Sequence, residues 1–533
     1  MTVAPHERRY TKTAWLALAV LLLCVSAGVQ WWAGADGDKH YLLVVAQRWL
    51  AGKRLYSDIF QPSFPLITWI DALAVLAASS GIVSSGHALA TLALLIVGCS
   101  VYTCHRLMQF HPQLRDNAPA LRLHALLLGF VFILWANPSY FADREHLFTA
   151  LLFPYMLRYM PSLARQAFPL HLRIAVAVMA TAGICIKPYC AIPFLGVQLL
   201  LWIRERSLRM SCSLEHAIIY GGGIVYLATM WHTMPDYFSA VLPMALATYS
   251  ATNRGIGGVV VLAAGSATML AVTLADFRLR HDSPYRRDIL YFLCLCPFFM
   301  AYILANNGWG YAFYALNSLI LYLTGWVYCE HRWLARRALE QGASARPFVF
   351  GGRACAMNLA ANTGLVLLMY FAAFTAAPQP TPQEELDSDL IRVVRDHHFQ
   401  SFGMLSAAFN PWPILADATG ARQETRFDQL WMIIKFLTSD AAFSKKNAWI
   451  PRYVAEKFAD DLNRNKPDVI FVEAGPQFYN TDVKIDLVGY FGAFPSFHDA
   501  WTHYSFLQAA DRCGEVHKAH KGGCRYDVYR RIP

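Results

Sequence analysis

Residues 34–65 of the chain read GADGDKHYLLVVAQRWLAGKRLYSDIFQPSFP and directly follow its first long apolar run. This polar stretch begins with two close acids, Asp36 and Asp38. The apolar residues that come next recur at helical spacing and mark one face of a short amphipathic helix, at positions 42, 45, 46 and 49. Gly52 suits the C-terminal cap of this helix. We expect Asp38 to lie at its N-cap, where free backbone N–H groups can hold a carboxylate.

The composition indicates a protein that crosses a membrane several times. Of its 533 residues, 56% are apolar and only 15% are charged, whereas soluble domains carry about 25% charged residues. The mean hydropathy is +0.31. The first apolar run, residues 13–33, is too long for a signal-peptide core and lacks a small-residue cleavage site, so we interpret it as a retained helix. The net charge of +10 does not indicate nucleic-acid binding, because the basic residues form short clusters between apolar runs.

Apolar runs continue along most of the chain and predict about eleven transmembrane helices. Several runs are shorter than the ~20 residues that span a bilayer, so we expect their flanks to be helical as well. The predicted spans are residues 13–33, 86–105, 122–137, 145–160, 172–186, 189–203, 215–234, 256–275, 289–305, 310–328 and 356–377.

The distribution of basic residues indicates the orientation of these helices. With the N-terminus in the cytoplasm, the cytoplasmic segments hold 21 Arg and Lys residues and the short opposite loops hold seven, in agreement with the positive-inside rule. This count requires that the apolar segment 64–83 does not cross the membrane. The segment carries Asp71 and is bounded by Pro65 and Gly81, and we interpret it as a helix that lies in or dips into the outer interface. The alternative is a full crossing, which would turn the later basic loops outward.

The chain divides into a membrane part and a soluble part. Residues 1–377 form the predicted membrane domain, with its first outer loop at 34–85, and residues 378–389 form a Pro- and acid-rich linker. Residues 390–533 are expected to form a small α/β domain, which lies outside the cytoplasm because the number of spans is odd. The elements predicted after the last span are a strand within residues 466–473 and helices at 385–396 and 427–437. The expected fold is therefore mostly α: a polytopic helical bundle with interfacial helices in the first outer loop, followed by this domain.

The chain contains 12 cysteines. Most lie inside apolar runs and are interpreted as small hydrophobic residues. No CxxC or Cys/His spacing predicts a metal site. The last two, Cys513 and Cys524, fall in the extracytoplasmic domain. We expect them to form a disulfide, because that environment is oxidising; the alternative is two free thiols.

Four polar clusters lie on the outer side of this topology. The first is the acid pair at 36 and 38, where a fixed Asp38 carboxylate can act as a general base towards a hydroxyl group; the alternative is an ordinary solvated loop. The second is the sequence Asp-Arg-Glu-His at residues 143–146. The planar fork of Arg144 suits a phosphate, and the alternative is a helix-end cluster that pairs internally.

The other two clusters follow later spans. Lys187 precedes Pro188 at an outer turn, where it can meet a lipid phosphate or extend to the interface as helix-end lysines often do. The run NNGWGY at residues 306–311 combines amides and aromatic rings. Such a combination suits a sugar, and it also suits an interfacial aromatic belt.

The chain resembles the GT-C superfamily of polytopic enzymes, which take sugars from polyprenyl-phosphate carriers on the outer face of the membrane. The superfamily includes the protein O-mannosyltransferases and the lipid A aminoarabinose transferase. The first-loop pattern of its bacterial members is matched by Asp38, Tyr41, Ala46, Gly52, Tyr56, Asp58, Pro62 and Pro65. Motifs of some members are also matched by the Arg-Glu-His-Leu sequence at 144–147, the Lys-Pro turn at 187–188, and the PWP sequence at 411–413 with Arg426 and Leu430-Trp431.

The resemblance implies an inverting glycosyltransferase that uses a polyprenyl-phosphate sugar. Asp38 would be the base, with Asp36 as its support or its alternate, because Gly37 separates two acids that are adjacent in many members. Arg144 and Lys187, together with His146, would hold the lipid phosphate. The rest of the predicted substrate-binding set is Glu145, Tyr41, Tyr56 and Asp58.

The expected partners are this donor, the lipid bilayer and a glycan, lipid or protein acceptor of the cell envelope. No cofactor is predicted: some superfamily members require a divalent metal, but the two acids are too few ligands to indicate one. The expected location is a bacterial cytoplasmic membrane. The alternative function is a transporter or flippase for a lipid-linked or anionic substrate, which would use the same outer cations without a base.

Overall fold

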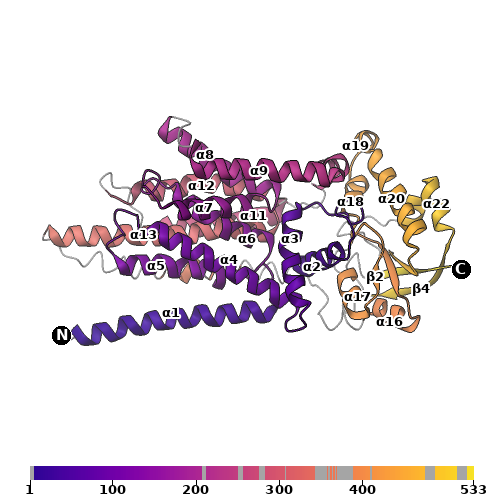
Figure 1. Ribbon diagram of the computed structural model, residues 1–533, viewed down its shortest axis with the longest axis horizontal. Coiled ribbons are helices and arrows are strands. Elements are labelled where there is room, and N and C mark those ends of the chain that lie inside the picture. The colour runs from indigo at the N-terminus through magenta and orange to yellow at the C-terminus, as the bar shows by residue number, and fades with distance from the viewer. Residues whose placement is uncertain are drawn as a thin grey trace. The chain divides into compact units, whose positions relative to one another are not determined.

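The computed structural model describes residues 5–35, 37–206, 212–249, 256–274, 283–306, 308–341, scattered positions between 357 and 368, and residues 388–407, 411–474, 486–512 and 525–532. Most of them are helical (Figure 1). The chain forms two compact units. The first comprises Met1–Lys39, Phe64–Leu227 and Arg254–Phe374, and the second comprises His40–Ser63, Ala228–Asn253 and Thr375–Pro533.

The first unit is built from the predicted apolar runs. Each of the first ten expected spans coincides with one helix or, at residues 122–137, with two consecutive helices, so a helix is confirmed at each of these positions. The helices are α1 (Pro5–Ala33), α4 (Ser85–Met108), α5 (Ala118–Gly129) with η1 (Phe130–Leu134), α6 (Arg144–Arg158), α7 (Leu170–Ile184), α8 (Ala191–Glu205), α9 (Leu214–Thr233), α11 (Ile256–Leu274), α12 (Arg286–Ala305) and α13 (Phe313–Glu340). The end of α9, from Ala228, belongs to the second unit.

Membrane-crossing helices are present by both length and composition. Among the described residues, five helical segments are long and apolar enough to cross a bilayer: Leu16–Ala33, Ser85–Met108, Gly257–Leu274, Arg286–Ala305 and Gly310–Ala338. The chain is therefore a multi-pass membrane protein. Most of the eleventh expected span, residues 356–377, lies outside the described residues.

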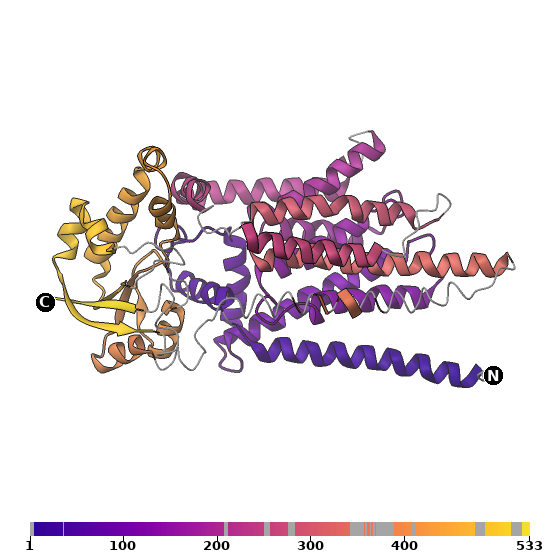
Figure 2. The ribbon, with the colours of Figure 1, turned by 180° about the vertical axis from the view of Figure 1, so that it is seen from behind.

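Helix α3 (Pro65–Ala78) is the predicted interfacial segment. It starts with proline at its first position, ends before Ser79, and has 14 residues, which is fewer than a perpendicular crossing needs. Its axis runs across the direction shared by α1 and α4, as the two opposite views show (Figures 1 and 2). This orientation agrees with a helix that lies along the interface.

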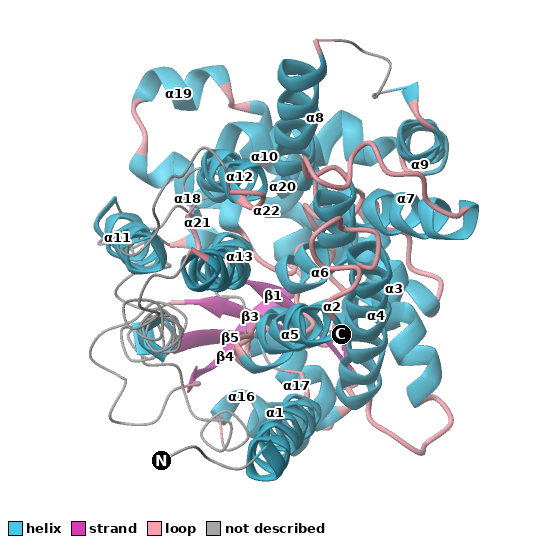
Figure 3. Ribbon diagram, turned by 90° about the vertical axis from the view of Figure 1, so that its left-hand side faces the viewer, coloured by secondary structure: helices cyan, strands magenta, loops and turns pink. Residues whose placement is uncertain are grey.

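The second unit contains a five-stranded mixed sheet with the order β2-β1-β3-β5-β4. Figure 3 labels four of these strands, β1, β3, β5 and β4. Strands β1 (Ser401–Leu405), β2 (Arg422–Gln423) and β3 (Val469–Glu473) are parallel, and β5 (Arg525–Arg531) and β4 (Tyr504–Asp511) are antiparallel to their neighbours. Every residue of β1 and β3 is buried, as expected for central strands that are covered on both faces.

The helices of the second unit are short. The expected strand within 466–473 is β3, and the helices expected at 385–396 and 427–437 are α16 and α18, so the α/β character of this region is confirmed. The helices are α16 (Asp389–Asp396), α17 (Pro411–Thr419), α18 (Trp431–Thr438), α19 (Ala441–Lys446), α20 (Trp449–Asn465), α21 (Leu487–Gly492) and α22 (Pro495–Trp501), together with η4 (Tyr237–Val241) and α10 (Leu242–Thr248). Cys513 and Cys524 lie outside the described residues.

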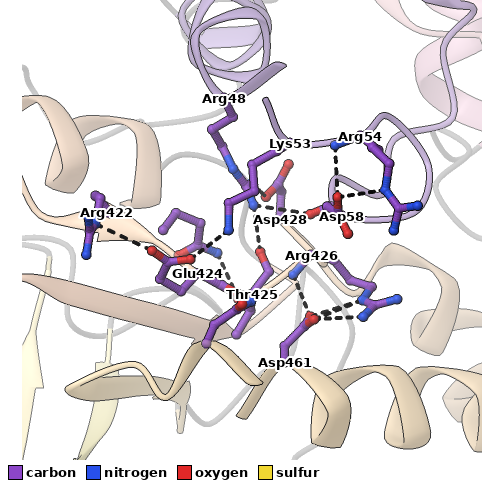
Figure 4. A network of polar contacts seen from close by, with 12 residues as sticks. Arg48, Lys53, Arg54, Asp58, Arg422, Glu424, Thr425, Arg426, Asp428 and Asp461 are labelled. Carbon is purple, nitrogen blue, oxygen red and sulfur yellow. Dashed lines mark hydrogen bonds and ion pairs between the residues drawn. The ribbon is translucent and has the colours of Figure 1, made fainter. Parts of the chain in front are cut away.

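Part of the first polar loop packs within this second unit. Arg48 donates a 2.6 Å ion-pair contact to Asp428 and a hydrogen bond to the Thr425 carbonyl, and Lys53 lies 2.9 Å from Glu424 (Figure 4). The sequence assigned residues 40–63 to the membrane domain and gave no signal of these contacts.

Helix α2 (Gly37–Leu50) begins earlier than expected. Asp38 therefore lies in the first turn of the helix and not at the N-cap, and this expectation was wrong. Gly37 has φ +48°, which lets the chain turn into the helix one residue before the acid. The end of the helix is as expected: Gly52 has φ +92°, and the N–H groups of Gly52 and Lys53 donate to the carbonyls of Trp49 and Arg48, which is a Schellman cap. Asp36 lies outside the described residues.

Candidate functional site

The first turns of two helices meet in the first unit. Asp38 is in the first turn of α2, and Arg144 is the first residue of α6. Arg144 Nη2 donates to Asp38 Oδ2 at 2.5 Å. The Arg144 side chain is only 10% exposed, whereas the Asp38 side chain is 34% exposed. The acid is therefore the member of the pair that a molecule from outside can reach.

Asp143 holds the start of α6. It is the N-cap of the helix, and its carboxylate accepts a hydrogen bond from the backbone N–H of Arg144 at 2.7 Å. The same carboxylate lies 3.6 Å from Arg144 Nε. Burial and the charge of Glu145 raise the pKa of Asp143 to about 7. Arg144 thus faces one accessible carboxylate and one buried carboxyl group that gains or loses its charge near neutral pH.

Lys187, Glu145 and Asn306 form a buried triangle. Lys187 Nζ donates to Glu145 Oε1 at 3.0 Å and to Asn306 Oδ1 at 2.8 Å, and Asn306 Nδ2 donates to Glu145 Oε1 at 2.9 Å. Pro188 favours the extended conformation of Lys187, which has φ −154° and ψ 142°. The ammonium group is therefore held on two sides and has little freedom to move.

His146 is enclosed by protein. Its Nε2 lies 2.7 Å from the Phe132 carbonyl oxygen, and its Nδ1 accepts from the Ala142 N–H at 3.3 Å. The carbonyl can only accept, so Nε2 carries the proton and the ring is neutral. The side chain is fully buried. This arrangement fixes the loop before α6, and it leaves neither ring nitrogen available to a phosphate.

Aromatic rings lie beside the lysine. Lys187 Nζ is 5.7 Å from the centre of the Tyr311 ring, and Trp309 stacks on Tyr311 with the ring planes 6° apart. A flat aromatic surface next to a cation suits a sugar attached to a phosphate. These rings come from the run at 306–311, of which Asn307 lies outside the described residues.

Comparison with solved structures identifies the architecture around this site. The crystal structure of ArnT from Cupriavidus metallidurans in the apo state superposes with a TM-score of 0.53 at 11% sequence identity, over 97% of this chain and 98% of that chain. The chain has a GT-C fold. A second crystal structure of ArnT, bound to undecaprenyl phosphate, matches with a TM-score of 0.43 at 12% identity, over the same shares of the two chains. Neither a family model nor a curated protein sequence matches the chain.

Asp71 was not among the predicted site residues. It lies on α3, is only 2% exposed, and its Oδ2 has no hydrogen-bond partner among the described residues. Burial raises the pKa of Asp71 well above its ordinary value, while the charge of Arg144 acts in the opposite direction and that of Asp143 adds to the rise. The acid therefore belongs to the electrostatic environment of the Asp38–Arg144 pair. An acid in an otherwise apolar helix was the signal in the sequence.

Asn306 was also missed. The amide is visible in the sequence, but an aromatic belt explains the run at 306–311 equally well, so Asn306 was not among the predicted site residues. The structure makes Asn306 a partner of both charges in the buried triangle. Sequence spacing carries no signal for this contact, because 119 positions separate Asn306 from Lys187.

The remaining predicted site residues belong to the second unit. Tyr56 is fully buried with φ +69° and donates its hydroxyl to the Ser63 carbonyl at 2.7 Å. Asp58 accepts from the backbone N–H and the Nε of Arg54. Burial raises the pKa of Asp58, but these hydrogen bonds outweigh it and leave the pKa below its ordinary value. Tyr41 packs edge-on against Trp412. All three support the folded loop in this unit.

Proposed function

We propose that this protein is an inverting membrane glycosyltransferase that moves a sugar from a polyprenyl-phosphate donor to a hydroxyl group of an envelope glycan, lipid or protein. The observation that carries the proposal is the pairing of Asp38 with Arg144 at two converging helix ends within a GT-C fold. A transferase of this kind needs a base for the acceptor and a cation for the leaving phosphate. The pair supplies one of each, side by side.

Asp38 is the general base in this proposal. Its carboxylate takes the proton of the acceptor hydroxyl as that oxygen bonds to C1 of the sugar, and the bond between C1 and the phosphate oxygen breaks. Attack from the face opposite the phosphate inverts the configuration at C1. The exposed position of Asp38 fits this role, because the acceptor has to reach it. Asp36 remains its support or alternate.

Arg144 and Lys187 serve the leaving group. The polyprenyl phosphate gains one negative charge when the sugar leaves, and fixed cations in a site that excludes water stabilise that charge. The fork of Arg144 can bind two phosphate oxygens at once. When the phosphate takes this arginine, the Asp38 carboxylate is released from its ion pair and can accept the proton of the acceptor hydroxyl. Donor binding would thus activate the base.

The setting of the site is proposed as follows. The protein lies in a bacterial cytoplasmic membrane with its N-terminus in the cytoplasm and the site on the outer face, where the lipid-linked donor and the acceptor meet. The outer soluble domain helps to bind the acceptor. Within the described part of the chain, no group of three or more His, Cys, Asp or Glu side chains is placed to hold a metal ion.

The proposal is tested by mass analysis of envelope glycolipids and glycans in a deletion strain. We expect one sugar-bearing species to disappear and to return with the wild-type protein but not with Asp38→Asn. The purified variant should still bind the polyprenyl-phosphate donor. A flippase would keep its product with Asp38→Asn, and a structural subunit would also tolerate the loss of Arg144 and Lys187; either result contradicts the proposal.

A further inference from the structure

The first unit contains a cavity of about 430 Å³ at the ends of the helices farthest from the candidate site. The candidate site lies at one end of three helices: Arg144 starts α6, Asn306 follows α12, and Lys187 lies in the turn before α8. The opposite ends of the same helices border the cavity. Helix α6 has 15 residues, so about 22 Å separates the two places. The cavity is lined by Tyr159, Pro161, Arg165, Leu200, Leu201, Arg204, Glu205, Arg287, Leu290, Tyr291 and Cys294.

The charges of the cavity favour an anion. Three of the lining residues are arginines and one is an acid, which leaves an excess of two positive charges. Glu205 is shared by Arg165 and Arg204, each at 2.8 Å. Arg287 is exposed, and no described residue forms an ion pair or hydrogen bond with its side chain. The positive charge of the three guanidinium groups therefore exceeds the negative charge of the one acid in the cavity.

A buried contact holds the walls of the cavity in place. Asp288, next to Arg287, accepts hydrogen bonds from the backbone N–H of Ser162 at 3.0 Å and from its hydroxyl at 2.6 Å. The same carboxylate lies 3.1 Å from His111 Nε2, and both side chains are fully buried. This joins the start of α12 to the turn after α6. The site is thus formed before a ligand arrives, which lowers the cost of binding.

The other walls are apolar and continue onto a lipid-facing surface. Leu200, Leu201 and Leu290 line the cavity. On the same end of α8, Trp202 is 53% exposed and Ile203 is 62% exposed, as expected for side chains that face acyl chains. A ligand that fills this cavity has an anionic head for the arginines and an apolar tail that extends into the bilayer.

We propose that this cavity binds the phosphate headgroup of an anionic phospholipid of the leaflet opposite the candidate site. Basic pockets between helix ends hold such headgroups, and arginine forks match phosphate oxygens. A free phosphate has the same anionic chemistry, but the apolar walls favour a headgroup that carries acyl chains. The site is separate from the proposed glycosyl transfer and does not depend on it.

The test uses the full-length protein in detergent and measures retention of phosphatidylglycerol and phosphatidylcholine by native mass spectrometry. The Arg287→Gln variant should weaken phosphatidylglycerol binding about fivefold, the loss expected for one basic contact with an anionic lipid. Arg122→Gln is the matched control, because Arg122 is exposed and does not line the cavity. Glu205→Gln should strengthen binding by releasing two arginines. Leu200→Trp should block the lipid by filling the cavity.

The results separate the possible ligands. Loss of phosphatidylglycerol with Arg287→Gln and Leu200→Trp, but not with Arg122→Gln, supports the proposal. Equal loss with Arg287→Gln and Arg122→Gln overturns it, because the attraction is then only that of the whole charged surface. Inorganic phosphate that displaces phosphatidylglycerol, with no effect of Leu200→Trp, assigns the arginines to a soluble phosphate and overturns the lipid site. Phosphatidylcholine retained as well as phosphatidylglycerol also overturns it.

Discussion

Asp38 and Arg144 are 106 positions apart in the chain, and their side chains meet with 2.5 Å between carboxylate Oδ2 and guanidinium Nη2. The contact joins the starts of α2 and α6 in the first unit. It gives one accessible carboxylate and one shielded cation at the same point, and the proposed chemistry follows from this difference in exposure. Removal of Asp38 should therefore affect deprotonation of the acceptor, and removal of Arg144 should affect binding and departure of the donor phosphate.

Arg144→Lys tests the role of the planar guanidinium group of Arg144. Lysine keeps the positive charge but cannot bind two phosphate oxygens in one plane. We expect the KM for the polyprenyl-phosphate donor to rise about tenfold and kcat to fall, because the leaving charge is less well stabilised. Steady-state kinetics of the purified enzyme measure both. Unchanged kinetics would show that Arg144 does not contact the donor phosphate.

Variants of Lys187 and Glu145 separate the effect of this ion pair on the unfolding free energy from its effect on transfer activity. Lys187→Met leaves Glu145 as a buried acid without its cation, and this should cost about 3–5 kcal/mol of unfolding free energy. The double variant with Glu145→Gln should recover most of that loss, since Asn306 can still hydrogen-bond to the amide. Thermal unfolding in detergent reports stability. Transfer activity should stay low in both variants, and recovery in the double variant would rule out a role of Lys187 in catalysis.

Asp143 predicts a pH dependence of donor binding. Its pKa is raised to about 7, so the carboxyl group is neutral below this pH and charged above it. Above pH 7 the charge competes with the donor phosphate for Arg144, and the donor KM should rise. Asp143→Asn keeps an N-cap oxygen and should flatten the profile between pH 6 and 8. A profile that is unchanged in this variant would assign the titration to another group.

Asp71 is a buried acid that we expect to lower the stability of the protein and to support its transfer activity. Asp71→Asn should leave the melting temperature equal or higher, because a buried acid without a full set of hydrogen bonds is unfavourable. At a pH above the raised pKa, where Asp71 carries a charge near Arg144, the transfer activity of the variant should fall roughly tenfold; below that pKa the acid is neutral and the substitution should change the activity little. A variant with full activity would show that Asp71 plays no part in the site.

Asp428 predicts a pH effect on the stability of the second unit. Burial raises its pKa to about 6, although Arg48 opposes the rise. The folded state then binds the proton more tightly than the unfolded state, so stability is greatest below about pH 4 and decreases as the pH rises to 6. The expected decrease from this group is about 3 kcal/mol. Asp428→Asn should remove it, whereas Asp499→Asn, at an exposed position, should not.

Most helices of the membrane part were predictable because their sequences are continuous apolar runs. The observed α4 (Ser85–Met108) and α12 (Arg286–Ala305) extend the predicted spans by only a few residues. Strand β3 was found because five apolar or buried positions follow a turn. Strands β4 and β5 were missed, since their exposed and polar residues carry no strong apolar pattern.

The site was predictable as a set of residue types and not as a geometry. Motifs indicated Asp38, Arg144 and Lys187 one by one, but a pattern along the chain cannot show which acid meets which cation. The partners of Lys187 depend on how three separate helices pack. The position of Asp38 within the first turn was missed because Gly37 adopts a positive φ angle that the sequence permits but does not require.

The central claim is that Asp38 is the base, and the most direct test is the transfer rate of Asp38→Asn at a saturating concentration of donor. Asparagine keeps the size of the side chain but cannot take the acceptor proton. We predict that kcat falls about 10²–10⁴-fold, while donor binding and the melting temperature stay close to those of the wild type. Asp36→Asn, measured in parallel, should keep a larger share of the activity. Transfer by Asp38→Asn at the wild-type rate would contradict the account.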